Sequence, residues 1–472
     1  MKGILSESDL RRIGTIVVSG YGDESPEMDE PCVVIDSRVI ADGDVFVALC
    51  GERTDAHRYI DEVFSKGASW AVVSEDWYAL HPIDPGMGRR RYLVVPDTVK
   101  GLQRLASAYR DTFAIPVVAV GGSNGKTTTK ELVASVLATG FRVHMSKGNL
   151  NNHLGVPLTL LQIKRDTEIA VVEMGINHPG EMELLASIAK PTHGLLTNIG
   201  HEHLEFLRDL DGVADAETRL YEYLDSNGGI CFVNTGDARL KKAAAGLRRT
   251  VLYGLDEFGE QVPHVEEIGL DEYGRATFFL CSGGKRHFVT LRLTGRHNVI
   301  NALAAAAVGS YFGLALAAVR EGLENLHPAS GWKRMEYRKA GGVTIINDTY
   351  NANPDSVRYA IDLLDELSCP GRKIAVLGDM LELGNSGALE HDKIGRYIQR
   401  STIDLLLTIG DLARGYVSGN EARAYGHYAN REELSKALLD MVRPGDVVLF
   451  KGSRGMRLDE AANVLCDERV SQ

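Results

Sequence analysis

A glycine-rich segment in the first third of the chain has the residue types that bind phosphate groups. It runs Gly121-Gly122-Ser123-Asn124-Gly125-Lys126-Thr127-Thr128 and directly follows the apolar run 115–120. An apolar run, a glycine loop and a helical pattern from about Lys126 predict a strand, a loop and a helix in that order. Such a loop turns backbone N–H groups toward phosphate, and the helix N-terminus adds partial positive charge. Lys126 would then contact the β- and γ-phosphates of a nucleotide, and the Thr127 hydroxyl would bind Mg²⁺.

This loop is shorter than the general phosphate loop. Val120 occupies the position of the first glycine in the pattern G-x-x-x-x-G-K-[ST], so the match begins only at Gly122. A chance glycine turn is the alternative explanation. The strand before the loop and the helix after it favour nucleotide binding.

Two further polar residues follow predicted strands and could reach the same phosphates. Glu173 comes after the apolar run 169–172, and His203 follows the run 194–197. In α/β folds the carboxyl ends of parallel strands present ligands in this way. Mg²⁺ prefers oxygen ligands, which makes an imidazole ligand atypical. A zinc pair of His201 and His203 is the alternative, although no cysteine or suitably spaced histidine completes it.

The elements that must position these residues fall into three parts. A length of 472 residues suggests about three domains at ~150 residues each. Short β-branched runs and turns occupy the first part, strand–loop–helix units begin near Ile115, and a Pro/Gly/Ser stretch at 328–331 marks a second boundary. Alternating short strands and helices predict parallel sheets in the middle and last parts. We therefore expect an α/β protein with domains at 1–112, 113–329 and 330–472.

Composition narrows the class of protein. The net charge of -12, without a large basic cluster, argues against a nucleic-acid partner. The N-terminus has no apolar core of signal-peptide length, which predicts a cytoplasmic protein. The uncharged run 302–319 is long enough to cross a bilayer, but it is rich in alanine and glycine interrupts it, so two packed helices and no membrane insertion are expected. Six scattered cysteines predict buried thiols in a reducing compartment.

Several segments resemble the Mur ligase family and the related folylpolyglutamate synthases. Besides the shortened loop, they are residues 148–158, 173–181, 295–304, 346–356, 376–384 and 451–455. The resemblance covers nearly the whole chain. It implies an ATP-dependent amide ligase with a small N-terminal α/β domain that binds a UDP substrate, a central P-loop ATPase-like domain with a parallel sheet, and a C-terminal Rossmann-like α/β domain.

The resemblance also implies roles for individual residues. ATP would be bound by Gly122, Ser123, Asn124, Gly125, Lys126, Thr127 and Thr128, with Asn298 and Asn301 at the adenine, Arg334 at the phosphates and Asp348 at the ribose. Metal ligands would be Thr127, Glu173 and His203, and catalysis would rest on Lys126, Glu173, His203 and Arg334. Substrate would be bound by Ser37, Arg38, Asn351, Asn353 and Lys451. Plainer explanations exist, because Asn298 could simply begin a helix and Asp355 or Ser356 could cap one.

Residues 350–356 and 378–384 are most similar to the family member that joins D-alanyl-D-alanine to UDP-N-acetylmuramoyl-tripeptide. The implied cofactors are ATP and Mg²⁺, the partners are these two substrates, and the chain would be a monomer. Addition of the third amino acid, or of glutamate to a folate, is an alternative within the enzymes. A nucleotide-dependent switch is an alternative of another class. Asp42 and Ala56 depart from the family pattern, which usually has proline and glycine at these positions. They weaken only the prediction of the local turn structure and do not change the implied function.

One departure concerns the second metal ion. Several family members carry a lysine after the metal-binding histidine, and its carbamylated end holds a second Mg²⁺. The matching position, fourteen residues beyond His203, is Glu217, and no lysine occurs from Pro191 to Leu240. The Glu217 carboxylate could hold this ion through a bridging water. Glu217 could equally lie on a solvated helix face, and both possibilities stay open.

Overall fold

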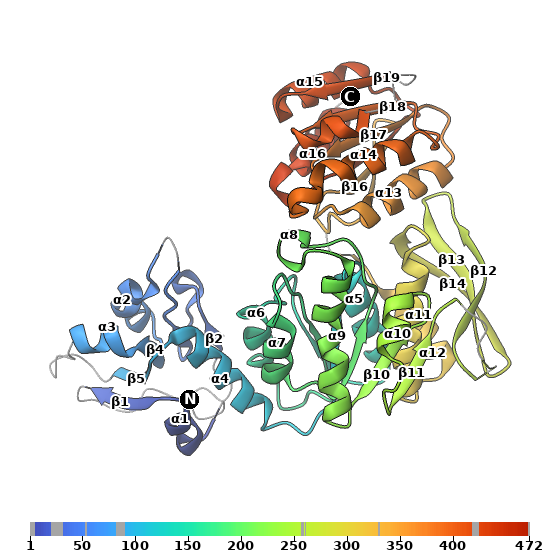
Figure 1. Cartoon of the computed structure of the whole chain (residues 1–472). Coiled ribbons are helices and arrows are strands. Elements are labelled where there is room, and N and C mark those ends of the chain that lie inside the picture. The colour runs from blue at the N-terminus through green and yellow to red at the C-terminus, as the bar shows by residue number, and fades with distance from the viewer. Residues whose placement is uncertain are drawn as a thin grey trace.

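A computed structural model describes residues 5–19, 32–51, 54–81, 90–255, 259, 261–328, 331–417 and 424–470. Its elements form three α/β domains, which confirms the predicted fold class. The N-terminal domain (blue) and the C-terminal domain (orange to red) lie at different sides of the central domain (Figure 1). The domain limits proposed from the sequence stay predictions, and the limit at residues 329 and 330 lies outside the described residues.

The N-terminal domain is built on a five-stranded sheet that is parallel except for its first strand. In spatial order the strands are β1 (Thr15–Ser19), β5 (Arg90–Val95), β4 (Trp70–Ser74), β3 (Val45–Val47) and β2 (Val33–Val34). The helices are α1 (Glu7–Ile13), η1 (Ser37–Val39), η2 (Ala56–Tyr59), α2 (Ile60–Ser65) and α3 (Glu75–Leu80). Helix α4 (Thr98–Arg110) leads into the central domain (Figure 1), where the Tyr109 hydroxyl donates to the Ile163 carbonyl at 2.8 Å.

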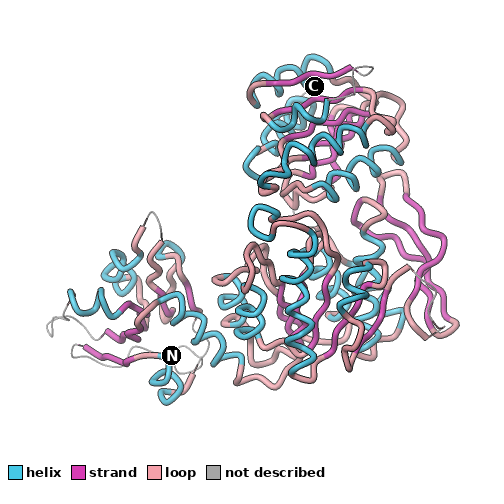
Figure 2. Tube along the Cα trace, in the orientation of Figure 1, coloured by secondary structure: helices cyan, strands magenta, loops and turns pink. Residues whose placement is uncertain are grey.

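The central domain contains a six-stranded sheet in which every pair of neighbours is parallel, as predicted. The strands are β11 (Thr250–Tyr253), β10 (Ile230–Asn234), β9 (His193–Leu196), β6 (Val117–Gly121), β8 (Ile169–Glu173) and β7 (Val143–Met145). Its helices are α5 (Lys126–Leu137), α6 (Gly155–Leu160), α7 (Glu181–Ala189), α8 (Leu204–Leu207), α9 (Leu210–Ser226), α10 (Ala238–Ala243), α11 (Asn298–Tyr311) and α12 (Leu316–Asn325). Figure 2 shows helices on both sides of these strands.

Strand β6 explains why the phosphate loop lies where it does. Val117 and Ala119 pack into one hydrophobic cluster, whereas Val118 and Val120 pack into another on the opposite face. A strand buried on both faces belongs in the middle of a covered parallel sheet. Strand β6 lies between β9 and β8; the chain leaves β6 toward β7 on one side, whereas it leaves the neighbouring β9 toward β10 on the other. The loop after β6 is therefore at a topological switch point, where α/β sheets bind ligands.

The uncharged run 302–319 forms parts of two packed helices, as predicted. Helices α11 and α12 contact each other and α5, and the alanines of α11 are almost fully buried. None of the described helices is long and apolar enough to span a membrane. The cysteine prediction is partly wrong, because Cys50 is exposed while Cys231 and Cys281 are buried.

A three-stranded antiparallel sheet in the central domain was not predicted from the sequence. It consists of β12 (His264–Leu270), β13 (Arg275–Ser282) and β14 (Lys285–Thr294). Residues alternate between partly exposed and buried along β13, and Gly283-Gly284 joins it to β14. That combination is a hairpin signal that sequence analysis could have used.

The C-terminal domain has a six-stranded sheet that is parallel apart from its edge strand β15. The strands are β15 (Glu336–Ala340), β16 (Val343–Asp348), β20 (Val447–Lys451), β17 (Lys373–Gly378), β18 (Leu405–Ile409) and β19 (Ala424–Tyr428). The helices are α13 (Pro354–Glu366), η3 (Gly384–Ser386), α14 (Gly387–Ile398), η4 (Leu412–Val417), α15 (Arg431–Met441), η5 (Arg454–Met456) and α16 (Leu458–Val470). The parallel sheet predicted here is thus confirmed, with the exception of the edge strand β15, which pairs antiparallel with β16.

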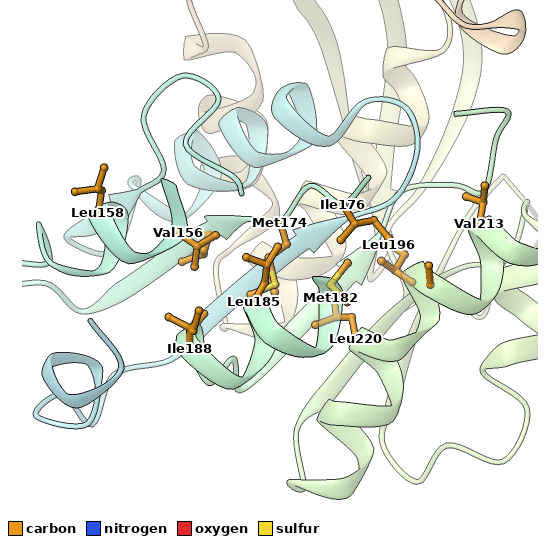
Figure 3. Close-up of a cluster of buried hydrophobic side chains, with 14 of the residues drawn as sticks. Val156, Leu158, Met174, Ile176, Met182, Leu185, Ile188, Leu196, Val213 and Leu220 are labelled. Carbon is orange, nitrogen blue, oxygen red and sulfur yellow. The ribbon is translucent and has the colours of Figure 1, made fainter. Parts of the chain in front are cut away.

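Helices α7 and α9 pack on the central sheet through the apolar cluster of Figure 3. Met182, Leu185 and Ile188 of α7 meet Val213 and Leu220 of α9 in this cluster. Because side chains four and seven residues apart share one face of a helix, Glu217 lies on the same buried face of α9 as Val213 and Leu220. Packing of α9 therefore directs a carboxylate toward the sheet.

Candidate active site

A cleft of about 300 Å³ lies between the central and C-terminal domains. The structure brings most of the predicted site residues together along its walls. They are Ser123, Asn124, Gly125, Lys126, Thr127, Thr128, Glu173, His203, Asn298, Asn301, Arg334, Asp348, Asn351, Asn353 and Lys451. Gly122, within the phosphate loop, and Glu217, which accepts a hydrogen bond from the Gly122 N–H, are not on its wall.

The backbone of the phosphate loop requires its glycines. Gly122 has φ 103° and Gly125 has φ 82°, a region that residues with a Cβ rarely adopt. A Cβ on Gly122 would lie 2.5 Å from Thr197 Oγ1, and one on Gly125 would lie 2.8 Å from Asn301 Oδ1. Gly125 precedes α5, so the loop leads directly into the N-terminus of that helix.

Lys126 points back into its own loop. Its ammonium group donates to the Gly122 carbonyl at 2.5 Å and the Ser123 carbonyl at 3.1 Å, and it pairs with Glu202 Oε2 at 3.2 Å. Burial alone lowers the pKa of Lys126, but the carboxylates of Glu202, Glu217 and Glu173 outweigh it and raise the pKa above its ordinary value. Lys126 is therefore a charged, partly buried cation at the phosphate loop.

Thr127 joins the two domains at the end of the loop. Its hydroxyl donates to Glu173 Oε1 at 3.1 Å and accepts from Arg334 Nη2 at 3.0 Å. The Arg334 guanidinium also lies over the Tyr350 ring at 3.8 Å, which fixes its plane. Glu173 ends β8 next to β6 in the sheet, as expected from its place after an apolar run.

His203 lies on the wall of the cleft and contacts the C-terminal domain. Its Nδ1 is 2.9 Å from Glu382 Oε2, and the hydrogen bond from His203 is the main reason why the pKa of Glu382 is lowered. The preceding histidine is held in the same way, because the backbone N–H and Nδ1 of His201 both contact Asp355 Oδ2. Each of the two histidines is thus paired through Nδ1 with a carboxylate of the C-terminal domain.

Glu217 is fully buried, so the solvated helix face considered for it is wrong. Its Oε2 accepts a hydrogen bond from the Gly122 N–H at 2.8 Å, and burial raises the pKa of Glu217 to about 7 against the opposing charge of Lys126. The spacing of Val213, Glu217 and Leu220 along α9 is the sequence signal that could have placed this residue inside.

On the opposite wall, strand ends of the C-terminal domain present charged groups. Asp348 ends β16 and Lys451 ends β20, and the two residues are partners in the sheet register. Their charged groups lie 2.6 Å apart, and Lys451 also donates to the Asn351 carbonyl at 2.8 Å. Asp348 Oδ1 accepts from the Met335 backbone at 3.2 Å.

The predicted asparagines form a hydrogen-bonded network within the cleft. Asn301 donates to Asn298 Oδ1 at 3.1 Å and accepts from the Thr129 hydroxyl at 3.1 Å. Asn353 donates to Asn124 Oδ1 at 2.8 Å and so joins α13 to the phosphate loop. Asn353 is also the N-cap of α13, with Ser356 as its capping-box partner. The N-cap suggested at Asp355 or Ser356 is therefore wrong, because Pro354 already lies inside the helix.

The structure does not bring Ser37 and Arg38 to this cleft. Both lie in η1 of the N-terminal domain, where Arg38 is exposed and pairs with Asp36 at 2.7 Å. The Ser37 carbonyl accepts from Lys66 Nζ at 3.0 Å. Any substrate that contacts them and the cleft must span two domains.

Three carboxylates surround Lys126, and each has one oxygen without a hydrogen-bond partner among the described residues. Within the described part of the chain, Glu173 Oε2, Glu202 Oε1 and Glu217 Oε1 are buried oxygens without a hydrogen-bond partner. Lys130 Nζ is 3.7 Å from that Glu173 oxygen. Hard carboxylate oxygens are the ligands that Mg²⁺ prefers. Sequence analysis did not select Glu202, because no motif distinguished it from its neighbours.

Comparisons with known proteins agree with this geometry. The Mur ligase middle domain matches residues 120–309, and the Mur ligase glutamate ligase domain matches residues 333–454. The chain is 37% identical to the UDP-N-acetylmuramoyl-tripeptide–D-alanyl-D-alanine ligase of Bacillus subtilis, over 93% of this chain and 94% of the relative. The ligase of the same name from Escherichia coli is 32% identical over 92% of this chain and 93% of its own length.

Solved structures give the same result. MurF from Acinetobacter baumannii superposes with a TM-score of 0.84 at 31% identity, covering 98% of each chain. MurF ligase from Thermotoga maritima, solved in complex with ADP, has a TM-score of 0.79 at 27% identity, covering 94% of this chain and 98% of that one. Family models and full-length relatives therefore place the chain in the Mur ligase family.

Proposed function

We propose that this chain is an ATP-dependent ligase that joins D-alanyl-D-alanine to UDP-N-acetylmuramoyl-tripeptide, forming the pentapeptide precursor of peptidoglycan. The observation that carries the proposal is the contact of Arg334 with Thr127, 3.0 Å across the cleft. It joins a phosphate loop in one domain to a cation in the next, as a ligase that closes over its substrates requires. Relatives that bear this enzyme name support the choice of substrates. We place the enzyme in the cytoplasm as a monomer.

The reaction proceeds in two steps. The terminal carboxylate of the tripeptide attacks the γ-phosphorus of ATP, a C–O–P linkage forms, and ADP leaves with the electrons of the broken P–O bond. The amine of D-alanyl-D-alanine then attacks the carbonyl carbon of this acyl phosphate. A C–N bond forms, inorganic phosphate leaves, and the amine loses a proton.

The residues of the chain position groups and balance charge rather than form covalent bonds. Residues 122–128 bind the phosphates, and Lys126 neutralises the charge that develops on the transferred phosphoryl group. Arg334 does the same from the C-terminal domain. Asn298 and Asn301 bind the adenine and Asp348 the ribose. Ser37 and Arg38 bind the uridine-diphosphate end, and Asn351, Asn353 and Lys451 bind the peptide end and the dipeptide.

Thr127, Glu173, His203 and Glu217 would hold Mg²⁺, with the unpartnered carboxylate oxygens of Glu173 and Glu217 as the supporting observation. Bound Mg²⁺ supplies charge neutralisation at the phosphate oxygens. The imidazole is an unusual ligand for this ion, but the carboxylates beside it supply the oxygen ligands that Mg²⁺ prefers.

Phosphate release tests the proposal directly. Purified chain, MgATP and UDP-N-acetylmuramoyl-tripeptide should release phosphate at a rate that rises strongly when D-alanyl-D-alanine is added, with one pentapeptide formed per phosphate. UDP-N-acetylmuramoyl-dipeptide with a free amino acid, and a folate with glutamate, serve as competing substrate pairs. Faster turnover with either pair, or ATP hydrolysis that ignores every amino-acid substrate, would contradict the proposal.

A further inference from the structure

Glu202 is a buried acid in the cleft, and the proposed function gives this residue no role. Its side chain is only 9% exposed and lines the cleft. Oε2 is 3.2 Å from Lys126 Nζ, whereas the buried Oε1 has no hydrogen-bond partner among the described residues. A buried carboxylate with one unsatisfied oxygen is unfavourable unless a cation compensates it.

The position of Glu202 is held from both sides. Its neighbours His201 and His203 each pair with a carboxylate of the C-terminal domain, Asp355 and Glu382 respectively. Between these two anchored residues, Glu202 places its Oε2 3.2 Å from Lys126 Nζ. The C-terminal domain therefore takes part in placing Glu202.

Lys126 neutralises more than one acid in the arrangement seen here. It contacts Glu202, and the charges of Glu202 and Glu217 both act on it. To bind the phosphates of ATP, the Lys126 ammonium must turn away from Glu202 and from the Gly122 and Ser123 carbonyls. Glu202 would then be a buried anion next to Glu217, whose Oε1 also lacks a hydrogen-bond partner among the described residues. Without a cation, the buried Glu202 charge and the acid beside it would oppose ATP binding.

We propose that Glu202 is a ligand of a divalent cation in the ATP-bound state. Glu202 then exchanges its contact with Lys126 for a metal ion, and Glu217 is a second ligand of the same ion. This inference rests on the proposed binding of ATP at residues 122–128. In the nucleotide-free protein Lys126 is the counter-charge of Glu202. When the phosphates attract Lys126, the ion takes its place, so that this second ion binds only together with the nucleotide.

A Mn²⁺ titration of the full-length chain tests the inference, with free Mn²⁺ measured by electron paramagnetic resonance. With one equivalent of a non-hydrolysable ATP analogue, the wild-type chain should bind two ions. Glu202→Gln should keep one ion and bind the second at least ~10-fold more weakly, as expected for loss of a ligand. Without nucleotide, the two proteins should bind Mn²⁺ alike, because Lys126 still occupies Glu202.

Two further variants make the result specific. Glu205→Gln removes the same charge three residues away on the exposed surface and should leave both ions in place. Glu202→Asp keeps a carboxylate at this position and should retain much of the affinity for the second ion. This variant therefore distinguishes loss of a ligand from misfolding. A wild-type chain that binds one ion with the analogue, or a Glu202→Gln chain that binds two with unchanged affinity, would overturn the inference. Ligation of D-alanyl-D-alanine is assayed separately, so failure of the proposed substrates would leave the ion count intact.

Discussion

His203 and Glu382 meet across the boundary between the central and C-terminal domains, with Nδ1 and Oε2 2.9 Å apart. Glu382 lies in the segment after β17, and its backbone carbonyl also accepts from the Glu205 N–H at 3.3 Å. A carboxylate on one ring nitrogen orients an imidazole and makes its other nitrogen a better metal ligand. In this geometry Nε2 is the atom with which His203 can bind a cation. At the proposed metal site, the position of the C-terminal domain would thus affect the affinity of His203 for the ion.

Glu382→Gln should raise the Mg²⁺ concentration needed for half-maximal activity by roughly 10–100-fold, the usual effect of removing such a partner. Activity at saturating Mg²⁺ should change much less, because the ligand itself is still present. The measurement is a Mg²⁺ titration of phosphate release at fixed ATP. Glu432→Gln removes a charge from an exposed site on α15 and is the control. Equal Mg²⁺ titrations for the two variants would refute the role of Glu382.

Lys126→Ala should lower turnover by ~10² or more, as for loss of one preorganised charge-stabilising group. Lys126 is the partly buried cation of the phosphate loop, and three carboxylates keep it charged. Steady-state phosphate release measures the effect, and a cooperative melting transition shows that the variant is folded. Lys100→Ala, on the exposed face of α4, should turn over normally. Near-normal turnover of a folded Lys126→Ala chain would remove Lys126 from catalysis.

Arg334→Lys tests whether the contact between the two domains needs a guanidinium. Lysine keeps the charge, but it cannot both reach Thr127 and stack flat on Tyr350 as Arg334 does. We expect turnover to fall by about 10-fold or more, since charge stabilisation in the transition state depends on orientation. Arg320→Lys on the exposed surface of α12 is the matched control. A turnover indistinguishable from the control would show that charge alone suffices.

The absence of a lysine near Glu217 predicts how the enzyme responds to bicarbonate. No lysine lies between Pro191 and Leu240 that carbon dioxide could modify. Activity should therefore be the same in carbonate-free buffer and in added bicarbonate. Glu217→Gln should strongly weaken the response to Mg²⁺, while its amide oxygen can still accept from the Gly122 N–H. An activity that rises with bicarbonate, or an unchanged Mg²⁺ titration of Glu217→Gln, would contradict this assignment.

His193 should make the folded state sensitive to acid. Burial, aided by the nearby Arg249 charge, lowers the pKa of His193 from 6.5 to about 4, so the folded protein keeps this imidazole neutral. Between pH 6.5 and about pH 4, the unfolded chain binds this proton and the folded chain does not. The free energy of unfolding therefore decreases as the pH falls through this window. The upper limit is about 3 kcal/mol, at ~1.4 kcal/mol per pKa unit.

His193→Gln should remove this part of the acid sensitivity. Melting temperatures at pH 7.5 and 4.5 measure it, and the variant should lose less stability on acidification than the wild type. His153→Gln replaces an exposed histidine and should behave as the wild type does. A wild type and a His193→Gln variant that lose stability in parallel would show that His193 is protonated in the folded state.

Sequence alone determined the features that depend on neighbours along the chain. The phosphate loop, with Gly122, Gly125 and Lys126 between β6 and α5, is a local strand–loop–helix unit, so its residue types and order were sufficient to predict it. Glu173 was likewise predictable, because it ends an apolar strand. The two helices of the uncharged run were recognisable from glycine breaks within an alanine-rich stretch. The family motifs located Arg334 and Asp348, although they did not indicate which atoms these residues contact.

Tertiary structure decided what depends on residues far apart in the chain. Which group Glu217 contacts depended on how α9 packs against the central sheet, where its carboxylate meets the Gly122 N–H. The Lys126–Glu202 pair joins residues from the loops after β6 and β9, and the pairing of His203 with Glu382 requires two domains to dock. Such contacts form only when separate elements bury their apolar faces against one another, and no local pattern of residues encodes them. The arrangement of charged groups in this cleft therefore arises only when the elements and domains have assembled.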